Sequence, residues 1–154
     1  MQNILLYLCC LISLYSIAQN TSTLQTKHFN SNKNIAIGGY DLVAYFTQNK
    51  AIEGNKKYTV SDQGIIYYFS LENNKRLFLK TPSNYEPQYG GWCAYAMGAK
   101  GTKVEIDPET FKIKDGKLFL FYHKLFTNTL LSWNKDEDNL NREADKNWKS
   151  IISK

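Results

Sequence analysis

The segment Tyr89-Gly90-Gly91-Trp92-Cys93-Ala94-Tyr95-Ala96 (YGGWCAYA) is the part of the sequence from which the fold can best be inferred. Two adjacent glycines allow the backbone to turn sharply, and the residues after them favour a short helix from Trp92 to Ala99. Gly101 is expected to end this helix, because glycine readily adopts the left-handed conformation that follows helix C-termini. Cys93 falls in the first turn of the predicted helix.

Downstream of this segment, strand patterns give way to helical ones. Residues 104–106 and 111–114 are predicted strands, and Asp115-Gly116 is typical of a hairpin turn. The almost wholly apolar run Leu118–Tyr122 predicts a central strand that is buried on both faces. Two apolar sets at helical spacing then predict C-terminal amphipathic helices. These sets are Phe126, Leu130 and Trp133, and Leu140, Ala144, Trp148 and Ile151, with Asp136 or Asp138 as the cap of the last helix.

Upstream of the segment, two local signals are clear. Asp41 is expected to cap a short helical turn through residues 42–46, because an aspartate oxygen can accept hydrogen bonds from the free N–H groups of a helix start. Lys57–Val60 and Ile65–Phe69 flank a turn that contains Gly64, which predicts a β-hairpin.

Ser70 is then expected to cap a helix over residues 71–80, and Pro82 to end it, because proline cannot continue the hydrogen-bond ladder. Taken along the whole chain, small antiparallel hairpins alternate with short helices. This order predicts an α+β fold, in which a small antiparallel sheet of hairpins packs with short helices and amphipathic helices follow at the C-terminus.

The N-terminus has the layout of a secretory signal. Residues 1–18 contain no charged side chain and include the apolar run Ile4–Ile17, which ends at small residues that suit signal peptidase. The run is shorter than the roughly 20 apolar residues of a spanning helix, although an uncleaved anchor stays open. We therefore expect a signal peptide over residues 1–18, a flexible tether over residues 19–34 in which His28 has no structural role, and export to the periplasm or the medium.

The charge pattern argues against a nucleic-acid partner. The formal net charge is +5, but the lysines are scattered and form no dense block interleaved with aromatic residues. A solvated basic surface is the expectation. The sequence also contains no Ser-His-Asp, His-Glu-x-x-His or nucleotide-binding motif, so no complete catalytic constellation can be assigned.

An ordered series of motifs resembles the exported YHS-domain proteins. Gly39–Phe46 (GYDLVAYF) resembles the opening motif of that family, and Tyr89–Ala96 resembles its Tyr-Gly-Gly-Tyr-Cys-Ala-Tyr segment. Further similar positions are Tyr67-Tyr68-Phe69-Ser70, Phe78, Pro82, Tyr85, Asp107-Pro108, Asp115–Leu118, Trp133, Ala144-Asp145 and Trp148. The resemblance covers about residues 36–150. It implies a single YHS-like domain over residues 35–152.

The resemblance also implies a link to metal binding. Short YHS modules occur beside heavy-metal transport ATPases and are similar to cysteine-rich metal-binding folds. The cysteines that those modules carry near the Phe-Ser motif are replaced here by Ser70, Asn73 and Asn74. A cysteine-rich site therefore does not carry over, and any metal ligands must come from other residues.

Cys93, Met97 and His123 are the candidate metal ligands. Cys93 is the only cysteine outside the predicted signal peptide. Met97 is four residues further on, so both sulfurs are expected on one side of the helix, where they form a soft pair suited to Cu(I). His123 could complete the shell. The structural alternative is that Cys93 and Met97 are buried hydrophobic side chains and that His123 lies at the surface.

A second candidate site consists of Tyr40, Asp41, Tyr89 and Tyr95, which could line a pocket with aromatic walls and one acid. The structural alternative is helix capping by Asp41 and core packing by the tyrosines. The first expectation is a non-catalytic exported domain that binds a ligand, with copper as the first candidate. A small-molecule or protein-partner module with a structural Cys93 comes next. A thiol-dependent enzyme that uses Cys93 and His123 comes last.

Overall fold

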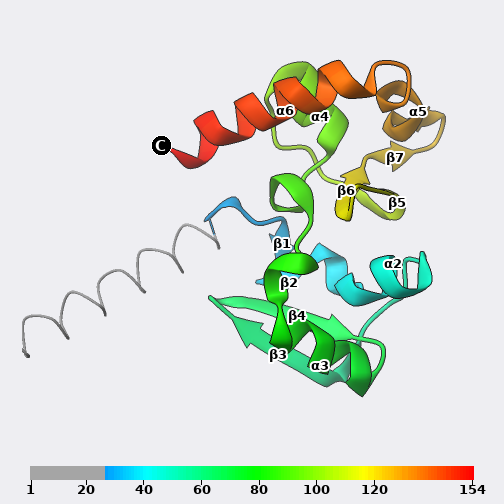
Figure 1. Ribbon diagram of the computed structural model, residues 1–154, viewed down its shortest axis with the longest axis vertical. Coiled ribbons are helices and arrows are strands. Elements are labelled where there is room, and N and C mark those ends of the chain that lie inside the picture. Colours follow the sequence, from blue (N-terminus) through cyan, green and yellow to red (C-terminus); the bar gives the residue numbers. More distant parts are fainter. Residues whose placement is uncertain (1–26) are drawn as a thin grey trace, which may run out of the picture.

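The first half of the chain builds a small mixed sheet (Figure 1). In the computed structural model, which describes residues 27–154, this sheet has the strand order β1-β2-β4-β3. The predicted hairpin is confirmed, because β3 (Asn55–Asp62) and β4 (Ile65–Phe69) pair in antiparallel orientation. The two-residue strands β1 (Ser31–Asn32) and β2 (Ile35–Ala36) extend the sheet, and β2 runs parallel to β4. The sheet is therefore mixed and not made of hairpins alone.

The part of the predicted tether that the structure describes is packed into the fold. His28, Phe29 and Asn30 are each only 7% exposed, and Phe29 belongs to the hydrophobic core around the sheet. The expectation of a mobile segment with an idle His28 is therefore wrong for these residues. The polar composition of this segment did not indicate that it contains one buried aromatic residue and the short strand β1. The predicted signal peptide and residues 19–26 of the tether lie outside the described residues.

Helix α3 (Glu72–Lys80) packs against β3 and β4, and α2 (Leu42–Gln48) packs against α3. The side chain of Asp41 caps α2 as predicted, since it accepts hydrogen bonds from the N–H groups of residues 43 and 44. Ser70 does not cap α3. Its hydroxyl instead donates to the Asp41 carboxylate, and the residue at the N-cap position, Leu71, makes no side-chain cap bond. The helix ends before Pro82, as expected.

In the second half, the YGGWCAYA segment forms a 3-10 turn, η3 (Gln88–Gly91), and then α4 (Ala94–Lys100). The helix begins later than predicted, so Cys93 occupies its N-cap position and not its first turn. Gly101 ends α4 with a φ of 62°, as expected.

The predicted hairpin around Asp115-Gly116 is also confirmed. It joins β5 (Asp107–Lys114) to β6 (Lys117–Phe121) in a two-stranded antiparallel sheet. Residues 104–106 are not a strand, although their apolar content had suggested one. β6 is buried on both faces as predicted, but it is not central, because β5 is its only partner in this sheet.

The chain ends in a small hairpin and two helices. The hairpin strands are β7 (His123–Lys124) and β8 (Thr127–Asn128), and Phe126 lies in the loop between them, fully exposed. Its predicted place on a helix is therefore wrong, and α5 covers only Thr129–Trp133. The last helix, α6 (Glu137–Ile152), lies beside α4 in Figure 1 and packs against it. Asp136 is its N-cap residue, but its side chain makes no cap bond.

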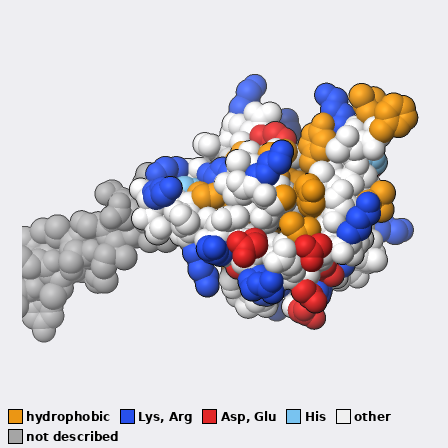
Figure 2. Space-filling view, turned by 90° about the horizontal axis from the view of Figure 1, so that it is seen from above, with side chains coloured by type: hydrophobic (Ala, Val, Ile, Leu, Met, Phe, Trp, Pro, Cys, Tyr) orange, Lys and Arg blue, Asp and Glu red, His pale blue; other side chains and the backbone are white. Residues whose placement is uncertain are grey.

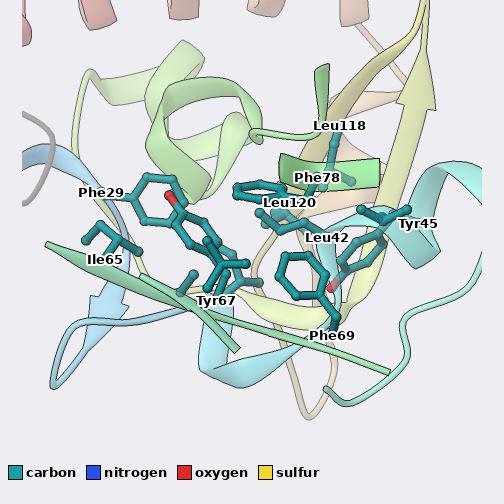
Figure 3. Close-up of a cluster of buried hydrophobic side chains, with 13 residues drawn as sticks. Phe29, Leu42, Tyr45, Ile65, Tyr67, Phe69, Phe78, Leu118 and Leu120 are labelled. Atoms are coloured by element: carbon teal, nitrogen blue, oxygen red, sulfur yellow. The ribbon is translucent and has the colours of Figure 1, made fainter. Parts of the chain in front are cut away.

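Strand β6 contributes to two hydrophobic clusters at once. Leu118 and Leu120 belong to the first cluster, which Figure 3 shows together with side chains of the sheet, of α2 and of α3 (Phe78). Phe119 and Phe121 belong to the second cluster, which lies with α4, α5 and α6. Alternation along one strand therefore couples the two halves of the fold. The α+β prediction is confirmed. Among residues 27–154, no helix is both long and apolar enough to cross a membrane.

Candidate functional site

The thiol of Cys93 lies inside the protein and serves as a hydrogen-bonding group. The residue is 0% exposed. Its Sγ atom accepts a hydrogen bond from the backbone N–H of Tyr122 at 3.3 Å and lies 3.4 Å from the hydroxyl oxygen of Thr129. These two residues flank the β7–β8 hairpin. The sulfur therefore contacts both ends of that hairpin and, at 0% exposure, is not in contact with solvent.

The other two predicted metal ligands are placed differently from each other. Met97 is fully buried and belongs to the second hydrophobic cluster. His123 has a side chain that is 41% exposed, and its Nδ1 atom lies 3.4 Å from Oδ2 of Asp107 and 3.2 Å from the Thr110 hydroxyl. The ring thus pairs with Asp107 and Thr110. A Cys93–His123 hydrogen bond, which a thiol-dependent enzyme needs, is not among the contacts of these described residues.

Within the described part of the chain, no group of three or more His, Cys, Asp or Glu side chains is placed to hold a metal ion. Copper binding by Cys93 and Met97 stays a prediction. A Cu(I) titration of the wild type and of Cys93→Ser tests it, since equal binding by both proteins would contradict it.

The second predicted site is divided between the two halves of the fold. Asp41 is 0% exposed, and both of its carboxylate oxygens accept hydrogen bonds within the protein. Tyr40 packs at the edge of the first cluster, and its hydroxyl lies 3.5 Å from Oε1 of Glu109. Burial, and then the nearby Glu109 and Glu53 carboxylates, raise the pKa of Tyr40. The hydrogen bonds that the Asp41 carboxylate accepts within the protein are therefore structural.

Tyr89 and Tyr95 belong to the second cluster. Tyr95 is half-buried at its edge. Tyr89 is 3% exposed, and its hydroxyl lies 2.9 Å from Oδ1 of Asn141 and 3.0 Å from Oδ1 of Asp145, both on α6. Burial, and then the Asp145 carboxylate, raise the pKa of Tyr89. Its phenol is therefore a hydrogen-bond donor at neutral pH. Of the four predicted residues, Tyr89 alone lines the groove described next.

A groove of about 510 Å³ lies where the N-terminal segment, η3 and α6 meet. This volume falls within the roughly 300–1,000 Å³ of small-molecule sites. Its apolar wall consists of Phe29, Pro87, Tyr89, Trp148 and Ile152. Such a wall offers aromatic surface to an organic molecule.

The charged side chains that line the groove are of both signs. Glu86 precedes η3, whereas Asp145 and Lys149 are four residues apart on α6. Over the face that Figure 2 shows, basic and acidic side chains are likewise interspersed and not gathered into one block. The groove therefore provides a few polar contacts around an apolar wall, which is the usual composition of a small-molecule site.

Backbone contacts to η3 hold the N-terminal wall of the groove in place. The N–H of Asn30 donates to the Gly90 carbonyl at 2.7 Å, and its side-chain amide donates to the Gly91 carbonyl at 3.1 Å. The indole N–H of Trp92 donates to the His28 carbonyl at 2.8 Å. A Cβ atom at Gly90 would lie 2.6 Å from that same carbonyl oxygen, so this close approach requires glycine.

Sequence reasoning found Tyr89 but missed the rest of the groove. A signal was present on α6, because Asn141, Asp145 and Trp148 recur at helical spacing and so share one face of the helix. In the sequence, Trp148 is predicted as a core position and is one of the positions similar to YHS-domain proteins. For His28 and Phe29 the sequence holds no such signal, because their role comes from packing against residues about 60 positions away.

Comparison with known proteins gives no match to a protein-family model, to a curated protein or to a solved structure. The fold class is α+β. The resemblance to exported YHS-domain proteins therefore stays a prediction that rests on the motif series.

Proposed function

We propose that this protein is a non-catalytic binding domain whose groove, formed by the N-terminal segment, η3 and α6, takes a small organic molecule. The observation that carries the proposal is the groove of about 510 Å³ with Tyr89 and Trp148 in its wall. The expected ligand has an aromatic or aliphatic body for this wall and one or two polar groups for the charged side chains at its edge. Cys93 is then a structural residue.

The features of the groove support a binding role more than a catalytic one. Asp145 and Lys149 offer charge, but Asp145 already lies 3.0 Å from the Tyr89 hydroxyl, which it helps to hold in place. The apolar wall provides most of the surface that a ligand could cover, and burial of apolar surface is the dominant source of affinity for small organic molecules.

A screen of aromatic and aliphatic fragments by ligand-observed NMR tests the proposal. For a fragment that binds, we expect Trp148→Ala to weaken binding at least tenfold, because loss of a large aromatic wall removes about 2 kcal/mol or more of contact. Phe126→Ala is the matched control, since Phe126 is a fully exposed aromatic residue outside the groove, and its removal should change the dissociation constant less than twofold.

A second groove variant guards against a folding defect in Trp148→Ala. Ile152 lines the groove but is 42% exposed, so Ile152→Ala should leave the fold intact and still weaken binding several-fold. The proposal fails if no fragment binds, or if the fragments that bind are insensitive to both groove variants.

A further inference from the structure

His28 forms part of the N-terminal wall of the groove, and its contacts hold the ring in the neutral form. The Nζ atom of Lys103 lies 3.1 Å from Nδ1 of His28. An ammonium group has only donors, so Nδ1 must be the acceptor and the ring proton is assigned to Nε2. Nε2 is buried and has no hydrogen-bond partner among the described residues. The imidazole therefore carries no charge in this arrangement.

The electrostatic surroundings of the ring also disfavour a second proton. Burial, followed by the positive charges of Lys103 and Lys27, lowers the pKa of His28 below the ordinary value of 6.5. Trp148 on α6 meets the ring edge to face, with centroids 6.1 Å apart, and is uncharged. The remaining charged side chains of the groove are Glu86, Asp145 and Lys149.

Protonation of His28 would disrupt its contact with Lys103. A proton on Nδ1 removes the acceptor of Lys103 and places a second positive charge next to the first, in a site that is shielded from water. The closed state already contains one buried donor without a partner, the Nε2–H group, which gains water if the segment moves outward. Two hydrogen bonds from Asn30, one from Trp92 and one from Lys103 to the Lys27 carbonyl oppose that movement. The burial of Phe29 in the first cluster opposes it as well.

We propose that the protonation state of His28 controls whether residues 27–30 stay in the wall of the groove, so that this segment acts as a pH-dependent latch. While the ring is neutral, residues 27–30 stay packed against η3 and Trp92, and His28 and Phe29 complete the groove. When the ring is protonated, this segment detaches and the groove loses that wall. The consequence for a ligand rests on the proposed function above: the ligand is held near neutral pH and released in mildly acidic solution.

The indole N–H of Trp92 reports on the latch without any ligand. It donates to the His28 carbonyl, so its NMR resonance should shift when the segment detaches. From pH 7.5 down to pH 5 we expect a sigmoidal change in the wild type, with a midpoint below 6.5. His28→Phe keeps a ring against Trp148 and cannot titrate, so its Trp92 resonance should stay constant. The Trp133 indole, bonded to Glu137, is the internal control and should not move.

Two results would overturn the latch. One is a Trp92 resonance that does not change in the wild type, and the other is an equal change in His28→Phe. If His28→Phe does not fold, as judged by its Trp133 resonance, Lys103→Met provides the second test. Removing one repelling charge should move the His28 midpoint upward, towards 6.5, and an unchanged midpoint would contradict the proposal.

Binding measurements separate failure of the latch from failure of the proposed function. For a fragment that occupies the groove, the dissociation constant should rise by up to tenfold per pH unit below the His28 midpoint, and His28→Phe should abolish this rise. Equal affinity at pH 7.5 and pH 5 in the wild type overturns the latch and leaves the binding function standing. A moving Trp92 resonance without any fragment that binds supports the latch and contradicts the binding function.

Discussion

Replacing Asp41 by asparagine tests whether this buried carboxylate is a structural junction. Its Oδ1 accepts hydrogen bonds from the N–H groups of Val43 and Ala44, at 2.9 and 3.2 Å. Its Oδ2 accepts three more, from the N–H of Ser70 at 2.7 Å, the hydroxyl of Ser70 at 2.6 Å and the side-chain amide of Asn74 at 2.8 Å. The side chain therefore ties the start of α2 to the start of α3.

Asp41→Asn keeps the size of the side chain but turns one acceptor into a donor. If the amide oxygen stays at the α2 cap, the new NH₂ group faces the Ser70 and Asn74 donors. The Ser70 hydroxyl can rotate and accept, but the Ser70 N–H loses its acceptor and the Asn74 amide keeps only its 3.5 Å contact with the Ser70 hydroxyl. At about 1–3 kcal/mol for each buried unsatisfied group, the expected loss is about 2–6 kcal/mol.

Urea unfolding monitored by tryptophan fluorescence measures this loss. With a slope of about 2 kcal/mol per molar urea, a loss near 4 kcal/mol lowers the midpoint by about 2 M. Asp115→Asn is the control, because Asp115 lies in an exposed turn with a φ of 51°, which asparagine accepts readily. This control should change the free energy of unfolding by less than about 0.5 kcal/mol. If Asp41→Asn is as stable as Asp115→Asn, the junction argument is refuted.

Two further predictions concern α6. A Cβ atom at Gly98 would clash with the carbonyl oxygen of Leu140. Gly98→Ala should therefore lower the free energy of unfolding by about 1–3 kcal/mol, even though alanine favours helices more than glycine does. A stability equal to wild type would show that α4 and α6 do not pack this closely. Burial opposes ionisation of Glu137, but hydrogen bonds from Lys112, Trp133 and Lys114 lower its pKa to about 2. Because this pKa is depressed from 4.5 on folding, the stabilisation is present above pH 4.5 and lost as the pH falls towards 2. Urea titrations between pH 5 and pH 2 should therefore show a smaller loss of stability for Lys112→Met than for the wild type, and equal losses would contradict the assignment.

The parts of the fold that could be predicted from sequence are those set by neighbours in the chain. Asp41 caps the helix directly after it, and the Gly64 and Gly116 turns join strands that are adjacent in sequence. Ser70 shows where this reasoning fails. Its local pattern suits a helix cap, yet the Asp41 carboxylate, 29 residues away, takes its hydroxyl. A buried charge needs donors more than an exposed helix end needs a cap, and the sequence does not show that the two meet.

The groove could be predicted only in part, because it also depends on contacts between residues that are far apart in the sequence. Tyr89 is a predicted pocket residue because it is one of the tyrosines grouped with Asp41, and α6 is predicted from its apolar spacing. The wall made by His28 and Phe29 depends on hydrogen bonds across about 60 residues, in a segment whose polar composition resembles a linker. A polar composition indicates that a segment cannot form a hydrophobic core by itself. It does not exclude that one side chain of the segment is buried against the rest of the protein.

The two ends of the YGGWCAYA segment make different contacts. At its first end, Tyr89 and Gly90 line the groove, and Trp92 holds the His28 carbonyl. At its second end, Cys93 faces inward and its sulfur accepts the Tyr122 N–H. A change that opens the first end therefore need not disturb the second. The proposed detachment of residues 27–30 would therefore remove Phe29 from the first cluster but leave the Cys93 contact to the β7–β8 hairpin in place.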